Sequence, residues 1–172
     1  MNDCNKIGKS LRQLFRTHDY KLHNQYIYDW ESDFFCISAS GYAVEVEIKI
    51  SYSDFKADFK KLQKHLILCG DKKCLTPNKF YYACPKGLIP LSEIPVYAGL
   101  IEWANGYCIK TKEAPFLHKT KEELKPILLS KYYNKCLSIF SKLLDFRREF
   151  TYGLQEDKRQ AFDAFINKFH EI

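Results

Sequence analysis

The stretch that decides the fold runs from residue 29 to residue 50 and reads DWESDFFCISASGYAVEVEIKI. Its second half alternates apolar and charged residues, a pattern typical of a β-strand whose successive side chains point to opposite faces. The charged face of this strand carries Glu45, Glu47 and Lys49. Charged groups on so hydrophobic a strand are unfavourable unless something uses them. A divalent cation with oxygen ligands, next to an amine that holds a water or a phosphate, is such a use.

The loop of the predicted hairpin determines which residues face each other. A two-residue loop would set Asp33 opposite Ile48, on the apolar face. A three-residue loop, 39–41, sets Asp33 opposite Glu47 instead, and its third residue is a glycine, which suits the left-handed conformation required there. Directly opposed residues lie about 4.5–5.5 Å apart at Cβ, so both carboxylates are close enough to bind one metal ion. Glu31 extends the same face.

This arrangement resembles the PD-(D/E)XK nuclease superfamily, in which an acidic residue opens one strand and (D/E)-x-K follows on the next. Asp33 matches the first position, and Glu47 and Lys49 match the second. The likeness covers roughly residues 25–118 and is similar in detail to small bacterial and phage DNA-repair nucleases of the MmcB-like type. The segments that carry it beyond the motif are 51–60, 80–89 and 94–100. It departs from the superfamily pattern at Ser32, where a proline is usual.

The resemblance implies an Mg²⁺- or Mn²⁺-dependent enzyme that hydrolyses phosphodiester bonds in DNA, in repair, phage or mobile-element biology. By this resemblance Asp33, Glu47 and the backbone carbonyl of Ile48 would hold the metal, with Glu31 as a further candidate ligand. Lys49 would orient or deprotonate the attacking water. RNA remains open as a substrate.

Two alternatives come from other classes of protein. One is a non-catalytic nucleic-acid-binding protein on the same fold. The other is a structural or interaction protein whose charged strand face simply meets water, because antiparallel hairpins often leave one face solvated.

Three lysines are candidates for nucleic-acid binding. Lys56, Lys60 and Lys64 stand at i, i+4 and i+8 on a helix predicted to begin at Ser53 and to end at Gly70. They would contact phosphates as point charges. A solvated lysine face explains the same spacing equally well, and the net charge of +6 is compatible with nucleic acid without demanding it.

The seven cysteines are scattered without a Cys-x2-Cys pair, which favours reduced thiols in a cytoplasm over a disulfide framework. A zinc set of His65, Cys69, Cys74 and Cys84 is conceivable, but its spacing lacks the tight pairs of structural zinc sites, so buried free thiols are favoured. No run of eighteen apolar residues and no apolar N-terminal segment occurs, and we expect no membrane partner.

The 172 residues, 46% of them hydrophobic, predict one domain, 1–172, with a core at about 5–118 and a helical C-terminal extension at about 120–172. The expected fold class is α/β (α+β): a restriction-endonuclease-like core with a mixed sheet of four or five strands flanked by helices. The oligomeric state stays open, a homodimer included. The predicted helices are 5–17, 53–69, 122–148 and 155–169, and the predicted strands are 33–38, 42–50, 80–84, 100–103 and 107–111.

Overall fold

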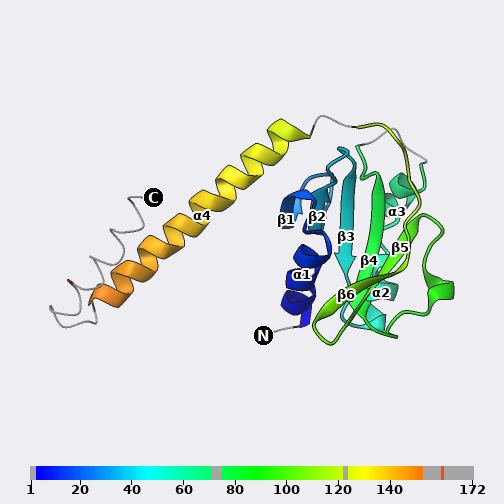
Figure 1. Cartoon of the computed structure of the whole chain (residues 1–172), viewed down its shortest axis with the longest axis horizontal. Coiled ribbons are helices and arrows are strands. Elements are labelled where there is room, and N and C mark those ends of the chain that lie inside the picture. Colours follow the sequence, from blue (N-terminus) through cyan, green and yellow to red (C-terminus); the bar gives the residue numbers. More distant parts are fainter. Residues whose placement is uncertain (1–2, 71–74, 122–123, 153–159, 161–172) are drawn as a thin grey trace. The chain divides into compact units, whose positions relative to one another are not determined.

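The computed structural model describes residues 3–70, 75–121, 124–152 and 160 (Figure 1). The elements follow in the order α1 Asp3–Leu14, β1 Asp19–Tyr26, β2 Glu31–Ile37, β3 Ala43–Ile48, α2 Tyr52–Asp58, α3 Leu62–Leu68, β4 Lys79–Pro85, the 3-10 turn η1 Leu91–Glu93, β5 Ala98–Ala104, β6 Tyr107–Lys112 and α4 Lys125–Tyr152. The chain divides into two compact units, Met1–Leu128 and Leu129–Ile172. Each is described by itself, and the prediction of a single domain stays a prediction.

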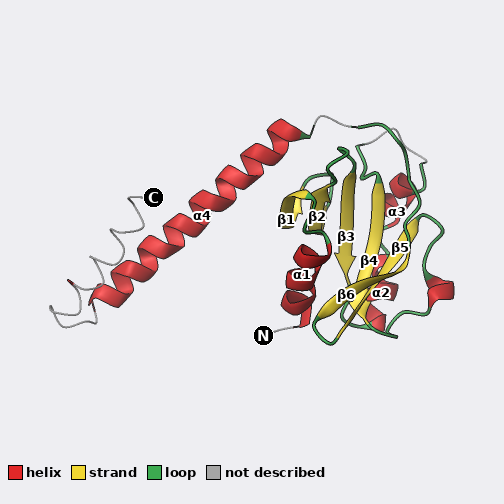
Figure 2. Ribbon diagram, in the orientation of Figure 1, coloured by secondary structure: helices red, strands yellow, loops and turns green. Residues whose placement is uncertain are grey.

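The first unit is built on one six-stranded mixed sheet with the strand order β1-β2-β3-β4-β5-β6 (Figure 2). The strands β1, β2 and β3 form an antiparallel meander, β4 and β5 run parallel to β3, and β6 returns antiparallel to β5. The predicted fold class, a mixed sheet flanked by helices, is confirmed. The sheet has six strands rather than four or five.

The additional strand is β1, at one edge of the sheet. Its sequence, DYKLHNQY, has no alternating apolar pattern, and Leu22 is its only buried residue. Tyr20 and Asn24 have positive φ angles of 50° and 51°, which interrupt regular strand geometry. An edge strand buries few side chains, so its sequence carries little of the periodic signal that identifies a strand.

The hairpin between β2 and β3 has the register that a three-residue loop requires. Phe34 pairs with Val46, and this is the last pair of the ladder. Gly41 has a φ of +84°, the left-handed conformation predicted for the third loop residue. Continued by one residue, the same register sets Asp33 opposite Glu47, so the predicted hairpin geometry is confirmed.

Helices cover both faces of the sheet. On one face α1 contributes Ile7 and Leu11 to an apolar cluster with the β3 residues Val44 and Val46. On the other face, where α2 and α3 lie, Phe55 and Leu68 join an apolar cluster formed with β4 and β5 (Figure 1). Every residue of β3 is buried. The alternative of a charged strand face that meets water is therefore wrong, because a central strand between two helical layers has no solvated face.

The single helix predicted at 53–69 is instead two short helices, α2 and α3, and this is a correction. Lys61 has φ −79° and ψ 58°, outside the helical range, and interrupts the helix between them. Leu62 and Leu66, expected in the apolar stripe, are 69% and 45% exposed. The break rotates α3, so that Lys64 rather than these leucines faces the sheet. The proposed spacing of three lysines along one helix is wrong for the same reason.

The remaining strands agree with prediction to within a few residues. The strands β4, β5 and β6 lie at 79–85, 98–104 and 107–112. Asn105 and Gly106 have φ angles of 52° and 86°, as expected of an Asn-Gly hairpin turn.

The long C-terminal helix is present as α4, beginning and ending a few residues later than predicted. Leu128 is buried, whereas Cys136, Ile139 and Leu143, on the same helical stripe, are exposed. Helical periodicity identifies a face that could be buried, not whether another element covers it. The helix predicted at 155–169 lies outside the described residues. None of the helices among the described residues is both long enough and apolar enough to cross a membrane.

Candidate functional site

Asp33 lies where β2 and β3 separate. Its Oδ2 accepts a hydrogen bond from the backbone N–H of Ile48 at 2.7 Å, one step beyond the last ladder pair. The next residue, Phe34, packs in the cluster on the α1 face, so Asp33 lies on the opposite face, with Glu47. The N–H and C=O of one strand residue point toward the same edge, so the Ile48 carbonyl is directed to the side where Asp33 lies.

Glu47 and Lys49 pair directly with each other. Lys49 Nζ donates to Glu47 Oε1 at 3.0 Å, and both side chains are nearly inaccessible to solvent. The other carboxylate oxygen of Glu47 accepts from Lys64 Nζ at 2.7 Å. Lys49 also lies 3.2 Å from Asp58 Oδ1 and 3.8 Å from Asp54 Oδ1. The three charged residues predicted to be functional are therefore brought together, inside a larger ionic cluster.

Asp58 is the central acidic residue that the sequence analysis missed. It ends α2, is 2% exposed, and receives Lys61 Nζ at 3.1 Å and the hydroxyl of Tyr82 at 2.9 Å. His65 Nε2 lies 3.5 Å from its second carboxylate oxygen. A signal was available: Phe55 is apolar and stands three residues earlier, so the two side chains share one face of a short helix.

Glu45 is fully buried beside Trp30 and Lys64. Its Oε1 accepts from the indole Nε1 of Trp30 at 2.7 Å and lies 3.5 Å from Lys64 Nζ. Its Oε2 has no hydrogen-bond partner in the part of the chain that the structure describes. The Lys64 ammonium lies 5.7 Å from the ring centre of Trp30 and 5.0 Å from that of Phe80, within range of cation–π attraction.

Two carboxyl groups of the cluster hold their protons unusually tightly. Burial and the charge of Glu47 raise the pKa of Asp33 to about 6, against the opposing effects of the Ile48 N–H and nearby lysines. Burial raises the pKa of Glu45 to about 7, although Lys64 and Trp30 act against the rise.

Glu47, Asp58 and Lys49 are held in their charged forms. Burial alone would raise the pKa of Glu47, but Lys64 and Lys49 outweigh it and lower that pKa. Burial would likewise raise the pKa of Asp58, but its bond with His65 and the neighbouring lysines lower it. Burial opposes the charge of Lys49, yet Glu47 and Asp58 raise its pKa above the usual range.

The cluster carries more negative than positive groups. It contains five carboxyl groups and three ammonium groups: Asp33, Glu45, Glu47, Asp54 and Asp58 against Lys49, Lys61 and Lys64. With every group ionised, the excess is two negative charges, which equals the charge of one divalent cation. The raised pKa values of Asp33 and Glu45 show where protons relieve this excess.

The other predicted site residues lie elsewhere. Glu31 is exposed and forms no ion pair with the cluster among the described residues. Lys56 is exposed and pairs with Glu93 at 3.0 Å, and Lys60 is exposed beside the cluster. Lys64 is buried and faces carboxylates, not solvent.

Of the zinc set considered from the sequence, Cys84 is buried, Cys69 is exposed, and Cys74 lies outside the described residues. Nowhere in the described ranges do three or more His, Cys, Asp or Glu side chains gather in a way that could hold a metal ion. Asp33 and Glu47 provide two such side chains, and the third predicted ligand is a backbone carbonyl.

Comparison with known proteins supports the fold alone. No protein-family profile matches the chain, and neither does any curated protein. Its structure is similar to that of SPO1766, a protein of unknown function from Silicibacter pomeroyi, with a TM-score of 0.62 and 17% sequence identity. The similarity covers 91% of this chain and 97% of that one.

Proposed function

We propose that this protein is a metal-dependent nuclease that hydrolyses phosphodiester bonds in DNA, with its reaction centre at Asp33, Glu47 and Lys49. One observation carries the proposal. Asp33 and Glu47 lie on the same face where two strands separate, and burial together with the charge of Glu47 raises the pKa of Asp33 to about 6. Like charges held close together in a buried site are unfavourable unless a proton or a cation offsets them.

The residues present fit a hard divalent cation. Mg²⁺ and Mn²⁺ prefer carboxylate and carbonyl oxygens, and Asp33, Glu47 and the Ile48 carbonyl supply these. Part of the raised pKa of Asp33 comes from the charge of Glu47, a repulsion that a shared cation would remove. When bound, the metal would supply positive charge at the phosphate and a water of lowered pKa.

Lys49 would orient the water or phosphate rather than remove a proton. Glu47 and Asp58 hold its ammonium at 3.0 and 3.2 Å and raise its pKa, so it keeps its proton at neutral pH. A fixed ammonium can donate hydrogen bonds and offset negative charge that develops in the transition state. Asp58 would act through Lys49 as a positioning residue.

The architecture supports the same proposal at a coarser level. The elements predicted from the sequence, a helix, a two-stranded hairpin, a helical segment and a further strand, follow in that order, with β1 added before the hairpin and the helical segment divided into α2 and α3. A cytoplasmic location and a role in DNA repair or phage biology belong to the proposal, based on the scattered cysteine pattern of the sequence and on the nuclease resemblance.

A second function is favoured by one observation. Both carboxylate oxygens of Glu47 already accept from lysines, so this residue is satisfied without a metal. A non-catalytic nucleic-acid-binding protein on the same fold would have this property.

A cleavage assay separates the two functions. The full chain is incubated with labelled single-stranded, duplex, flap and junction DNA and with RNA, in Mg²⁺ or Mn²⁺ and in EDTA. We expect metal-dependent cleavage by the wild type and none by Asp33→Asn or Glu47→Gln. The matched control is Lys9→Ala, an exposed residue of α1 on the opposite face of the sheet, which should cleave like the wild type. Binding without cleavage across the panel would establish the second function instead.

A further inference from the structure

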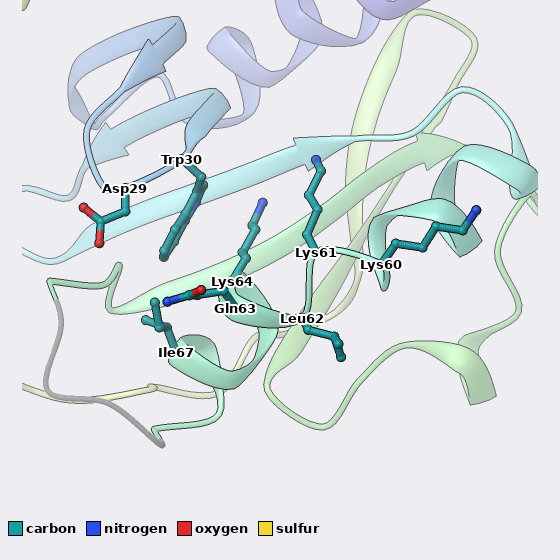
Figure 3. A pocket seen from close by; sticks show the side chains of 8 residues that line it. All are labelled: Asp29, Trp30, Lys60, Lys61, Leu62, Gln63, Lys64 and Ile67. Atoms are coloured by element: carbon teal, nitrogen blue, oxygen red, sulfur yellow. The ribbon is translucent and has the colours of Figure 1, made fainter.

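A cavity of about 540 Å³ lies directly beside the ionic cluster. Its volume is within the range of roughly 300–1,000 Å³ usual for small-molecule sites. The lining is aromatic, cationic and amide-bearing at once: Trp30 forms one wall, and Lys60, Lys61, Gln63 and Lys64 contribute from the start of α3 and the turn before it (Figure 3). Nothing in the proposed reaction uses this combination.

Two of the lining residues connect the cavity to the reaction centre. Lys61 is more than half exposed, yet its ammonium lies 3.6 Å from Glu47 and 3.1 Å from Asp58. Trp30 reaches the cluster through its hydrogen bond to Glu45. In Figure 3 Lys61 and Lys64 extend in the same direction, toward the strands, and Trp30 stands beside Lys64. A ligand in the cavity is therefore adjacent to the ionic cluster that contains Glu47.

We propose that this cavity binds one unpaired nucleobase of a single-stranded nucleic acid, next to the phosphate that is cleaved. The inference rests on the proposed function for its position in the reaction, and the cavity supplies the chemistry of recognition. A base stacks on an aromatic side chain whatever its identity, and the Trp30 ring provides that surface. Gln63 offers both a donor and an acceptor to a base edge, and Lys60 offers positive charge to the flanking phosphates.

The geometry selects against a base inside a duplex. A paired base is stacked between its neighbours and presents only its groove edges, so its face cannot stack on the Trp30 indole. A base at a single-stranded end, loop or flap has no such restriction. The proposed substrate class is therefore a nucleic acid with an unpaired nucleotide at the site of cleavage.

Intrinsic fluorescence gives a direct readout of the stacking. The chain has two tryptophans, and Trp103 lies on β5, where its indole donates to Ser10 on the α1 side of the sheet. In a Trp103→Phe background Trp30 is the only indole. The probes are a labelled thymidine 12-mer, an abasic 12-mer with the same backbone, and a 12-base-pair duplex, all in EDTA to prevent turnover. Binding is followed by anisotropy of the label and by Trp30 emission.

We expect the thymidine 12-mer to quench Trp30 and to bind about tenfold more tightly than the abasic strand. Trp30→Leu should remove that tenfold preference and leave binding of the abasic strand unchanged, while Lys9→Ala changes neither. If Trp30→Leu does not fold, Trp30→Phe, which keeps an aromatic ring, should retain part of the preference. Equal affinity for the abasic strand, unchanged emission on binding, or equal affinity for the duplex each overturn the inference.

The two proposals fail separately. Quenching by the thymidine strand without metal-dependent cleavage by the wild type would leave the base pocket standing and remove the nuclease. Cleavage in Mg²⁺ without quenching would leave the nuclease standing and remove the pocket.

Discussion

Replacing Glu45 by glutamine should change how the stability of this protein depends on pH. Glutamine preserves the shape of the side chain and an oxygen that can accept from Trp30, but it cannot lose a proton. In the wild type, burial raises the pKa of Glu45 from an ordinary 4.5 to about 7. Between these values the unfolded chain releases this proton while the folded chain retains it. The contribution of Glu45 to stability is therefore fully present below pH 4.5 and is lost as the pH rises through 7.

The size of the effect follows from the two pKa values. A difference of one in pKa corresponds to about 1.4 kcal/mol, so Glu45 should reduce the free energy of unfolding by roughly 3 kcal/mol between pH 4.5 and pH 8. Asp33, with its pKa raised to about 6, should act in the same direction at lower pH and is retained in the variant. A group with a lowered pKa, such as Asp58, stabilises the folded protein throughout the range from pH 4.5 to pH 8. Its contribution is lost only at lower pH.

The assay is urea unfolding of the metal-free protein at several pH values from 5 to 8. Glu45→Gln should show a decline in unfolding free energy about 3 kcal/mol smaller than the wild type across the range. Glu31→Gln, an exposed acid on β2, is the matched control and should keep the wild-type decline. If Glu45→Gln and the wild type decline in parallel, Glu45 does not carry a raised pKa and the proposed charge balance of the cluster is wrong.

Three further changes test the site. Mg²⁺ or Mn²⁺ at millimolar concentration should raise the melting temperature of the wild type but not that of Asp33→Asn. Without metal, Asp33→Asn should be no less stable than the wild type, because the repulsion between Asp33 and Glu47 has been deleted. Equal shifts of the melting temperature in both proteins would exclude a metal at Asp33. Lys64→Leu should lower the free energy of unfolding by about 3–5 kcal/mol in urea, because it removes a buried ammonium that both Glu45 and Glu47 contact, and a loss below about 1 kcal/mol would contradict this. Lys60→Ala should reduce the slope of log affinity for nucleic acid against log salt concentration by about 0.7–0.9. Lys56→Ala should reduce this slope less, because the Lys56 ammonium is already paired with Glu93. If Lys60→Ala and the wild type have identical slopes, Lys60 does not belong to the nucleic-acid surface.

Local sequence was sufficient to predict the hairpin that creates the site. Alternation with period two assigns each residue of β3 to a face, and the glycine at position 41 selects the loop length. Together these two local rules determine the register and predict that Asp33 and Glu47 are opposed. Neither rule requires knowledge of any residue outside 29–50.

Only the tertiary structure decided what surrounds that pair. The burial of Glu45, Glu47 and Lys49 depends on α2 and α3 lying over their face of the sheet. The helical segment is interrupted at Lys61, between α2 and α3. The turn of α3 that results directs Lys64 into the cluster, and the end of α2 brings Asp58 there. Residues 45 and 64 are far apart in the sequence, and no local pattern records that their charges meet. Hydrophobic periodicity identifies which face of an element is to be buried, but the partner across a buried charge is set by packing between elements, which only the folded chain determines.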